Sequence, residues 1–413
     1  MRNPALLRLD PAPRPVTRGA EWLMLVTSTR VTYPEPRPRL KEAMKPAFHH
    51  FALTLMVNHA CNLRCTYCYT GAKFSSPMPE MTGQAAIERA LRSLAPHGRL
   101  DLGFFGGEPL LEAQRIMDWI AFARSRAATL GKRVGFNLTT NGTITGAPAW
   151  AVMMQDDLEL AVSFDGTPRW HDRHRRDTQG NGTSTQVEAA IGKLLKAGKA
   201  LTVVMVVRPD NLEAIPEALE HLHGLGVRQA HLSLDLWTAW TAEDGRRLDE
   251  VVTRAAGLWR GWLPDFSLNW FDGKTASLAG LPAAEETTQC GFGDGEVAVA
   301  PSGRLYPCER LIGEDRPDHP LRLPGHALEG ADFLQPPGAA FEREAPCTRC
   351  LLASACDTFC RCSNFIRTGD TNRPDGLLCI LNKATARATL EVLAREAPPP
   401  LAAKSRNQEK CYA

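Results

Sequence analysis

The sequence predicts an α/β protein in which a curved, partial (βα)6 barrel of the TIM-like type precedes a cysteine-rich, loop-rich domain. Between residues 51 and 237, short β-rich apolar runs alternate with longer amphipathic stretches, which is the pattern of repeated βα units around a parallel sheet. From residue 286 onward the chain becomes rich in cysteine, proline and glycine and loses long periodic segments. We therefore expect metal to hold the second region together.

Six short runs in the first region carry a strand pattern, because they are apolar and rich in β-branched or aromatic residues. They are 51–57, 101–105, 133–139, 158–164, 201–207 and 229–234. Stretches with apolar residues three and four positions apart lie between them and predict helices, for example at 82–94, 110–127 and 182–198. In such folds the chemistry gathers at the C-terminal ends of the strands, so motifs that directly follow a strand are the candidate site.

Changes in composition divide the rest of the chain. We expect an N-terminal extension, the barrel, a bridging region, the cysteine-rich domain and a C-terminal helix end with a mobile tail, at 1–50, 51–237, 238–285, 286–385 and 386–413. The extension holds one strand pattern at 21–33, and the bridge holds an amphipathic helix around 249–263. A last helix is predicted from about 381 to 396.

Charge and hydropathy exclude some classes of function. The chain has 413 residues, a formal net charge of +2 and 44% hydrophobic residues, and it lacks a long basic stretch interleaved with aromatic residues, so nothing indicates nucleic-acid binding. No run of eighteen apolar residues and no apolar signal segment is present, so we expect neither membrane insertion nor secretion. The predicted compartment is the reducing cytosol, where cysteines serve as metal ligands rather than as disulfides.

The most informative motif follows the first predicted strand, where Cys61, Cys65 and Cys68 stand in the segment CNLRCTYC. Three thiolates on one short loop can hold three corners of a [4Fe–4S] cluster and leave the fourth iron open for chemistry. Structural zinc is the alternative, but it usually takes four ligands, and His59 would have to complete the site from an awkward position.

This spacing resembles the signature of radical S-adenosylmethionine (SAM) enzymes. The resemblance implies that SAM chelates the open iron and that one electron cleaves its sulfonium. The product would be a 5′-deoxyadenosyl radical, which abstracts hydrogen from unactivated C–H bonds.

Motifs after the later strands resemble the elements that bind SAM in this superfamily. The run from Gly106 to Pro109 follows the second strand and resembles the element that binds the SAM amino group, with glycines that permit close backbone approach. An HDxxR element at 171–175 offers a guanidinium for the SAM carboxylate. By this resemblance the SAM contacts are Tyr67, Gly106, Gly107, Glu108, Asn141, Ser163, Asp165 and Arg175. As an alternative, the Asn-Gly and Asp-Gly pairs in these motifs are ordinary turn dipeptides.

The C-terminal cysteines resemble a SPASM domain, which carries two auxiliary [4Fe–4S] clusters, so the cofactors would be three such clusters and SAM. The resemblance implies that one auxiliary cluster is held by Cys347, Cys350, Cys356 and Cys379. The other would be held by Cys290, Cys308 and Cys360, and either Cys362 is its fourth ligand or one iron stays open. Glu309 stands where relatives have an aspartate that takes a substrate proton, so we expect it to act as a catalytic base.

The predicted function is therefore that of a peptide maturase that forms an oxidative thioether or carbon–carbon crosslink in a ribosomally made peptide. Expected partners are that peptide, a reductant such as flavodoxin or ferredoxin, and a separate leader-peptide recognition protein. Alternatives are a maturase of a protein substrate, of the sulfatase or amine dehydrogenase type, and, from another class, a non-catalytic iron–sulfur electron carrier. Four aromatic side chains near the expected mouth would either shape a peptide groove or pack in the core: Trp237, Trp240, Trp270 and Phe271.

Overall fold

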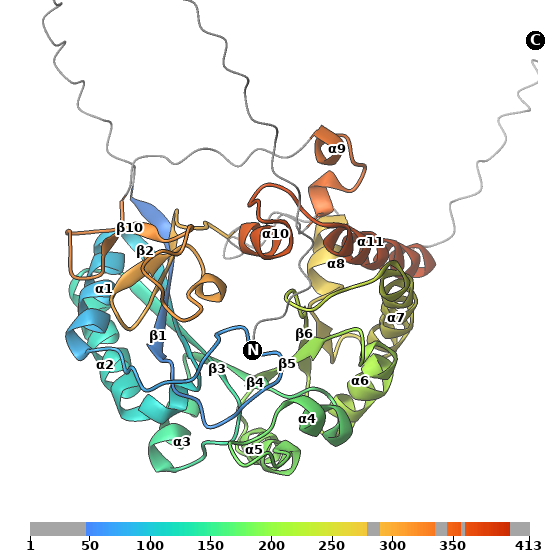
Figure 1. Cartoon of the computed structure of the whole chain (residues 1–413), viewed down its shortest axis with the longest axis horizontal. Helices are drawn as coiled ribbons and strands as arrows, with labels where there is room; N and C mark the ends of the chain where they lie inside the picture. Colours follow the sequence, from blue (N-terminus) through green and yellow to red (C-terminus); the bar gives the residue numbers. More distant parts are fainter. Residues whose placement is uncertain (1–46, 279–289, 335–344, 357–359, 397–413) are drawn as a thin grey trace, which may run out of the picture. The chain divides into compact units, whose positions relative to one another are not determined.

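The computed structural model describes residues 47–278, 290–334, 345–356 and 360–396 (Figure 1). The strand predicted at 21–33 and the C-terminal tail lie outside the described residues. Within the described part, no helix is long and apolar enough to cross a membrane.

All six predicted barrel strands are confirmed. They are β1 (Phe48–Asn58), β2 (Leu94–Gly106), β3 (Arg133–Thr140), β4 (Leu158–Ser163), β5 (Leu201–Val207) and β6 (Gln229–Leu234). Each pairs in parallel with the next, and β7 (Ser267–Leu268) adds a short parallel strand beyond β6. The described sheet runs from β10 at one edge to β7 at the other and does not close on itself, so the fold is a partial barrel.

Helices between the strands cover the outer face of this sheet, as Figure 1 shows. They are α1 (Glu80–Arg92), α2 (Ala113–Thr129), α3 (Ala147–Met153), α4 (Pro168–His174), α5 (Ser184–Lys196) and α6 (Ile215–Gly224), with short 3-10 turns η1 (Pro109–Glu112) and η2 (Leu212–Ala214). The predicted helix at 110–127 is thus a 3-10 turn followed by α2.

Side chains alternate across the strands and so create both a core and a cavity. On β5, Val203 and Met205 are fully buried in the core, whereas Thr202, Val204 and Val206 line the cavity on the opposite face. The period of two that identifies a strand therefore also assigns its inward side chains. Because the inward residues are small, space remains at the barrel centre.

The bridging region and the C-terminal region contribute two more groups of elements. The first comprises α7 (Ala242–Gly261), α8 (Asp272–Leu278), α10 (Arg361–Thr368) and α11 (Gly376–Glu396). The second comprises β8 (Glu296–Val299), β9 (Arg304–Tyr306), β10 (Leu323–His326), α9 (Ala345–Thr348) and the 3-10 turns η3 (Glu309–Leu311) and η4 (Ala353–Ala355). Helix α11 begins earlier than predicted because Asp375 accepts a hydrogen bond from the Leu378 amide (3.1 Å), as an N-cap residue does.

Strand β8 joins the barrel sheet directly, which the sequence did not predict. It pairs in parallel with β1 from Ala52↔Glu296 to Leu55↔Val299, and β9 returns antiparallel to β8. The tight return needs Gly303, whose φ of +86° few other residues adopt. This pairing brings the segment that follows β9 to the barrel.

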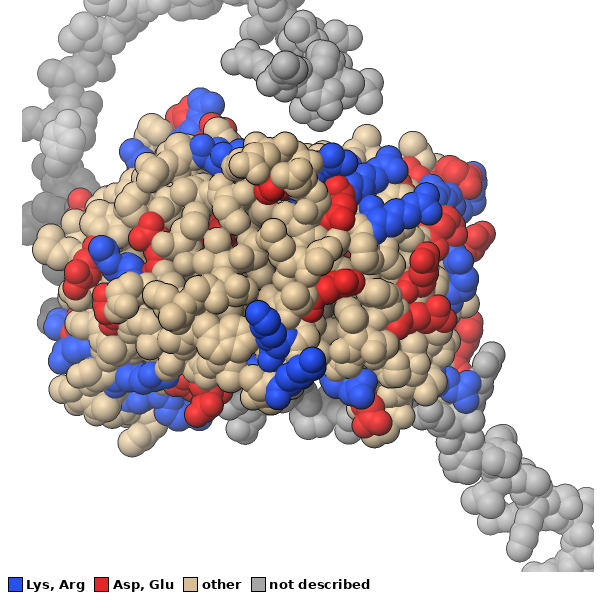
Figure 2. Space-filling view, turned by 90° about the horizontal axis from the view of Figure 1, so that it is seen from below, with Lys and Arg blue, Asp and Glu red and all other residues tan. Residues whose placement is uncertain are grey.

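Charges on the described surface are mixed rather than separated. On the face drawn in Figure 2, Lys and Arg side chains lie among Asp and Glu side chains, and no patch of one sign covers it. The formal charge of +2 is therefore not the sum of two large opposite patches on this face.

Candidate active site

A cavity of about 450 Å³ lies at the C-terminal ends of the barrel strands, and the predicted cysteine loop forms part of its wall. Cys61, Cys65 and Cys68 all line it, and all three are half-buried. Three thiols that face one cavity fit a three-cysteine iron–sulfur site, because the donor set is all sulfur and one side of the site is left open. Burial raises the pKa of the Cys61 thiol to about 11, so iron must displace protons to bind.

The loop is held in place by the end of β1 and by Lys73. The side chain of Asn58 accepts hydrogen bonds from the amides of Ala60 (2.9 Å) and Ser76 (3.0 Å) and so ties both ends of the loop together. The Lys73 ammonium donates a hydrogen bond to the Cys68 sulfur (3.0 Å). Although burial opposes it, the charge and hydrogen bond of Lys73 lower the pKa of Cys68. Lys73 also lines the cavity, and the sequence patterns did not identify it.

The two glycines after β2 pack against the cysteine loop itself. A Cβ on Gly107 would lie 2.2 Å from the carbonyl oxygen of Ala60, and one on Gly106 would lie 2.5 Å from that of Asn58. The Gly107 amide also donates to the Asn58 carbonyl (2.9 Å). Glycine is therefore required by contact between two backbones, in addition to both residues lining the cavity.

Glu108 is almost fully buried beside the same cavity. Its carboxylate accepts hydrogen bonds from the Thr140 hydroxyl (2.7 Å), the Asn141 amide (2.7 Å) and the Leu110 amide (3.0 Å). Burial raises its pKa despite these donors. In turn the side-chain amide of Asn141 donates to Asn62 within the cysteine loop (2.9 Å). Glu108 and Asn141 thus connect the ends of β2 and β3 to the loop.

Tyr67, Asp165 and Arg175 form one buried network. The carboxylate of Asp165 accepts hydrogen bonds from the Tyr67 hydroxyl (2.5 Å), Arg175 Nε (3.2 Å) and the Val206 amide (3.2 Å). The Arg175 guanidinium also lies over the Tyr67 ring, 5.3 Å from its centre. Tyr67, Arg175 and Ser163 line the cavity, whereas Asp165 is not among the lining residues. The structure therefore places Asp165 as the residue that orients the other two.

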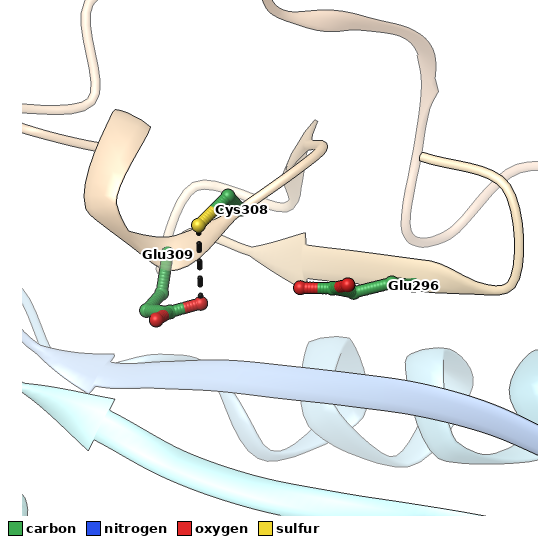
Figure 3. Close-up of side chains that lie close together, drawn as sticks. All are labelled: Glu296, Cys308 and Glu309. Atoms are coloured by element: carbon green, nitrogen blue, oxygen red, sulfur yellow. Dashed lines mark hydrogen bonds between the residues drawn. The ribbon is translucent and has the colours of Figure 1, made fainter. Parts of the chain in front are cut away.

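The segment after β9 enters the same cavity. Glu309 and Arg310 both line it, together with residues of the barrel. Figure 3 shows Glu309 beside Cys308, whose thiol donates to the Glu309 carboxylate (3.5 Å), and Glu296 extending from β8 toward both. The ligand atoms of these three residues lie within 4.8 Å of one another. The sequence predicted Cys308 and Glu309 here and missed Glu296.

The thiols predicted to hold the first auxiliary cluster lie close to one another. The Cys290 thiol donates a hydrogen bond to Glu296, Cys362 shares a hydrogen bond with Cys308, and the sulfurs of Cys360 and Cys362 are 3.3 Å apart. These contacts fit a thiolate-bound cluster at this place.

The second predicted set is spread over α9, η4 and α11. Cys347, Cys350, Cys356 and Cys379 are all half-buried. Buried Lys274 on α8 donates to the carbonyl of Ala355, next to Cys356, and to the side chain of Asn382 (2.7 Å), one turn beyond Cys379. Lys274 thereby joins the two segments that carry these cysteines, and the sequence gave no signal of it because its partners are remote in the chain.

Arg310 is buried between the two groups of thiols and lines a second cavity as well. This outer cavity, of about 420 Å³, shares Tyr69, Trp237 and Arg310 with the inner one. The rings of Tyr69 and Trp237 stack 4.5 Å apart, and Trp237 is 45% exposed. Trp270 and Phe271, in contrast, are buried in the core, so only Trp237 of the predicted aromatic residues is both exposed and at a cavity.

Comparisons with known proteins agree with this geometry. Residues 55–222 match the radical SAM superfamily. The chain is 25% identical over 345 residues to a serine-type anaerobic sulfatase-maturating enzyme from Klebsiella aerogenes, covering 78% of this chain and 82% of that protein. It is 23% identical over 344 residues to a PqqA peptide cyclase from Granulibacter bethesdensis, covering 79% of this chain and 86% of that protein.

A solved structure shows the same fold. The structure of native anSMEcpe with bound AdoMet has a TM-score of 0.69 at 18% identity, covering 83% of this chain and 98% of the other. The same protein with bound AdoMet and the Kp18Cys peptide has the same TM-score and identity.

Proposed function

Residues 55–222 form a radical SAM domain, and on that premise we propose that the chain is a peptide maturase that forms an oxidative thioether or carbon–carbon crosslink. One observation carries the proposal: a single cavity is lined by the three thiols of the cysteine loop and by Glu309, which follows an auxiliary-cluster cysteine. A hydrogen-abstracting centre and a proton acceptor therefore face the same bound substrate.

The residues of the chain divide into those that hold cofactors and those that act on substrate. Cys61, Cys65 and Cys68 would hold the first [4Fe–4S] cluster, and the SAM contacts would be those expected from the sequence, with Asp165 acting through Tyr67 and Arg175. Two auxiliary clusters would be held by Cys347, Cys350, Cys356 and Cys379 and by a set that includes Cys290, Cys308 and Cys360. When bound, these groups supply a 5′-deoxyadenosyl radical for hydrogen abstraction and an acceptor for the electron that substrate releases.

Glu309 is the proposed base. Its carboxylate reaches the cavity from the turn that follows Cys308, so it is placed to take the proton that substrate loses when the new bond forms. Tyr69 and Trp237, which separate the inner cavity from the outer one, would exclude water from the inner cavity. A reductant such as flavodoxin or ferredoxin and a separate leader-peptide recognition protein remain proposed partners, and the cytosol remains the predicted compartment.

Anaerobic co-expression with short peptides encoded beside the gene tests this function. We expect the intact peptide mass to fall by two hydrogens for each crosslink, and we expect no change with the Cys61→Ala variant. Fragmentation then locates the bond. An unchanged peptide mass with the active enzyme would contradict an oxidative crosslink.

Maturation of a sulfatase is the second candidate, favoured by the likeness to the Klebsiella aerogenes enzyme. It predicts formylglycine in a sulfatase-derived peptide, and an aldehyde-reactive hydrazide would label that product but not a crosslink. A non-catalytic electron carrier, in contrast, would form no 5′-deoxyadenosine from SAM under anaerobic reduction.

A further inference from the structure

We propose that Cys362 is the fourth thiolate of the auxiliary cluster held by Cys290, Cys308 and Cys360, so that this cluster presents no open iron to substrate. The inference rests on the proposed function only in requiring that an auxiliary cluster binds there. It decides between two roles for that cluster, because an open iron could bind a substrate sulfur, whereas a saturated cluster can only exchange electrons.

Cys362 contacts two of the three other thiols. It lies in the first turn of α10, and Cys360 is the N-cap residue of that helix. Its sulfur is 3.3 Å from that of Cys360 and shares a hydrogen bond with Cys308. Only 2% of Cys362 is exposed, and it packs with Leu311. A thiol held between two ligands in an apolar pocket needs little movement to bind the same iron–sulfur group, which would separate sulfurs that touch in its absence.

The charge beside Cys362 supports the same assignment. The Arg310 guanidinium is fully buried, and the thiols of Cys362 and Cys360 are among the groups that act on it electrostatically. One of its nitrogens donates to the Ser363 hydroxyl, at 3.4 Å. A buried cation is costly unless negative charge lies nearby. Thiolates bound to iron would supply that charge on the side where Cys360 and Cys362 lie.

Glu296 is the competing ligand. Its carboxylate accepts hydrogen bonds from the Cys290 thiol and from the Gly291 amide (3.1 Å) and approaches Cys308 (Figure 3). We assign the fourth position to Cys362 because iron–sulfur clusters are held by thiolates in the great majority of proteins. Glu296 is then a hydrogen-bonding partner of the site, and Glu309 is the side chain through which this segment reaches the substrate.

The experiment isolates the auxiliary clusters and asks whether any iron is open. The Cys61→Ala/Cys65→Ala/Cys68→Ala background removes the SAM-binding cluster, whose own open iron would otherwise interfere. Reconstituted protein is then oxidised mildly, and the [3Fe–4S] signal in electron paramagnetic resonance is quantified, because an iron without a protein thiolate is lost first. Iron content is measured in parallel.

Three variants are compared in that background. We expect little [3Fe–4S] signal from the parent and from Glu296→Gln. We expect Cys362→Ala either to form about one equivalent of [3Fe–4S] cluster or to lose about four irons, since one of four protein ligands is gone. Ser363→Ala is the matched control, because Ser363 is the next residue on α10 and contacts both Arg310 and Cys360. It should behave as the parent does.

Each other outcome overturns the assignment. A strong [3Fe–4S] signal from the parent means that the iron is open, and a signal that appears with Glu296→Gln but not with Cys362→Ala transfers the position to Glu296. Equal losses in Cys362→Ala and Ser363→Ala mean that packing, not ligation, is responsible. Failure of the proposed function is separate, because it would appear as absent SAM cleavage in the protein with an intact cysteine loop.

Discussion

The substitution Asp165→Asn tests the buried ion pair that fixes Arg175 beside the cavity. The side chains of Asp165 and Arg175 are 1% and 8% exposed, and the carboxylate also accepts the Tyr67 hydroxyl hydrogen bond. Asparagine keeps the shape and one acceptor oxygen but leaves the guanidinium without its counter-charge. Removing one partner of a buried pair costs about 3–5 kcal/mol, so we expect the free energy of unfolding to fall by about that amount.

The assay is anaerobic chemical denaturation of the reconstituted protein, with midpoints compared at unchanged denaturant dependence. Asp157→Asn is the matched control, because Asp157 pairs with Arg124 on the surface, where both side chains are more than 40% exposed. An exposed pair contributes about 0–1 kcal/mol. The double variant Asp165→Asn/Arg175→Gln should lose less than the sum of its single variants, by about 1–3 kcal/mol. The reasoning is refuted if Asp165→Asn is no more destabilising than Asp157→Asn, or if the single effects add.

Three further predictions follow from other contacts. Glu309→Gln should keep 5′-deoxyadenosine formation but slow crosslinking by about 10²- to 10⁴-fold, as loss of a catalytic base does, and equal product yields would remove Glu309 from the mechanism. Gly107→Ala should lower iron binding by the cysteine loop, because its Cβ would lie 2.2 Å from the Ala60 carbonyl; full iron content would contradict that. Arg126 holds the pKa of Glu88 at about 2, so this pair stabilises the fold above the ordinary carboxyl pKa of 4.5 and is lost as pH falls toward 2. Glu88→Gln should therefore flatten the acid side of the stability profile, and an unchanged slope would count against the pair.

The parts of the fold that the sequence predicted are those with local periodicity. The six barrel strands and the helices between them have a period of two or of three to four residues, which burial on one face imposes. Strands β8 and β9 were missed because three or four residues are too short to show a period. Their pairing with β1 is a long-range contact, and only the turn at Gly303 gave a local signal.

In the site, the cysteines could be predicted because metal ligation imposes a spacing that is readable in the chain. Glu296, Lys73 and Lys274 could not, because each acts through partners that the fold alone brings near it. Lys274, for example, connects a carbonyl 81 residues away with a side chain 108 residues away. Asp165 was predicted as a SAM contact, and the structure instead gives it contacts to the residues that line the cavity.

The buried cations have a common physical explanation in the charge of the clusters. Without iron, burial raises the pKa of Cys61 to about 11, and the hydrogen bond with Cys308 together with burial raises that of Cys362 to about 12, so both thiols are neutral at pH 7. Iron binding replaces those protons and leaves thiolates in poorly solvated positions. Lys73 stands at one such position and Arg310 at another. Each is costly to bury by itself but is favourable beside an anionic group, so both are best understood as residues that the loaded protein requires and the cysteine spacing alone does not disclose.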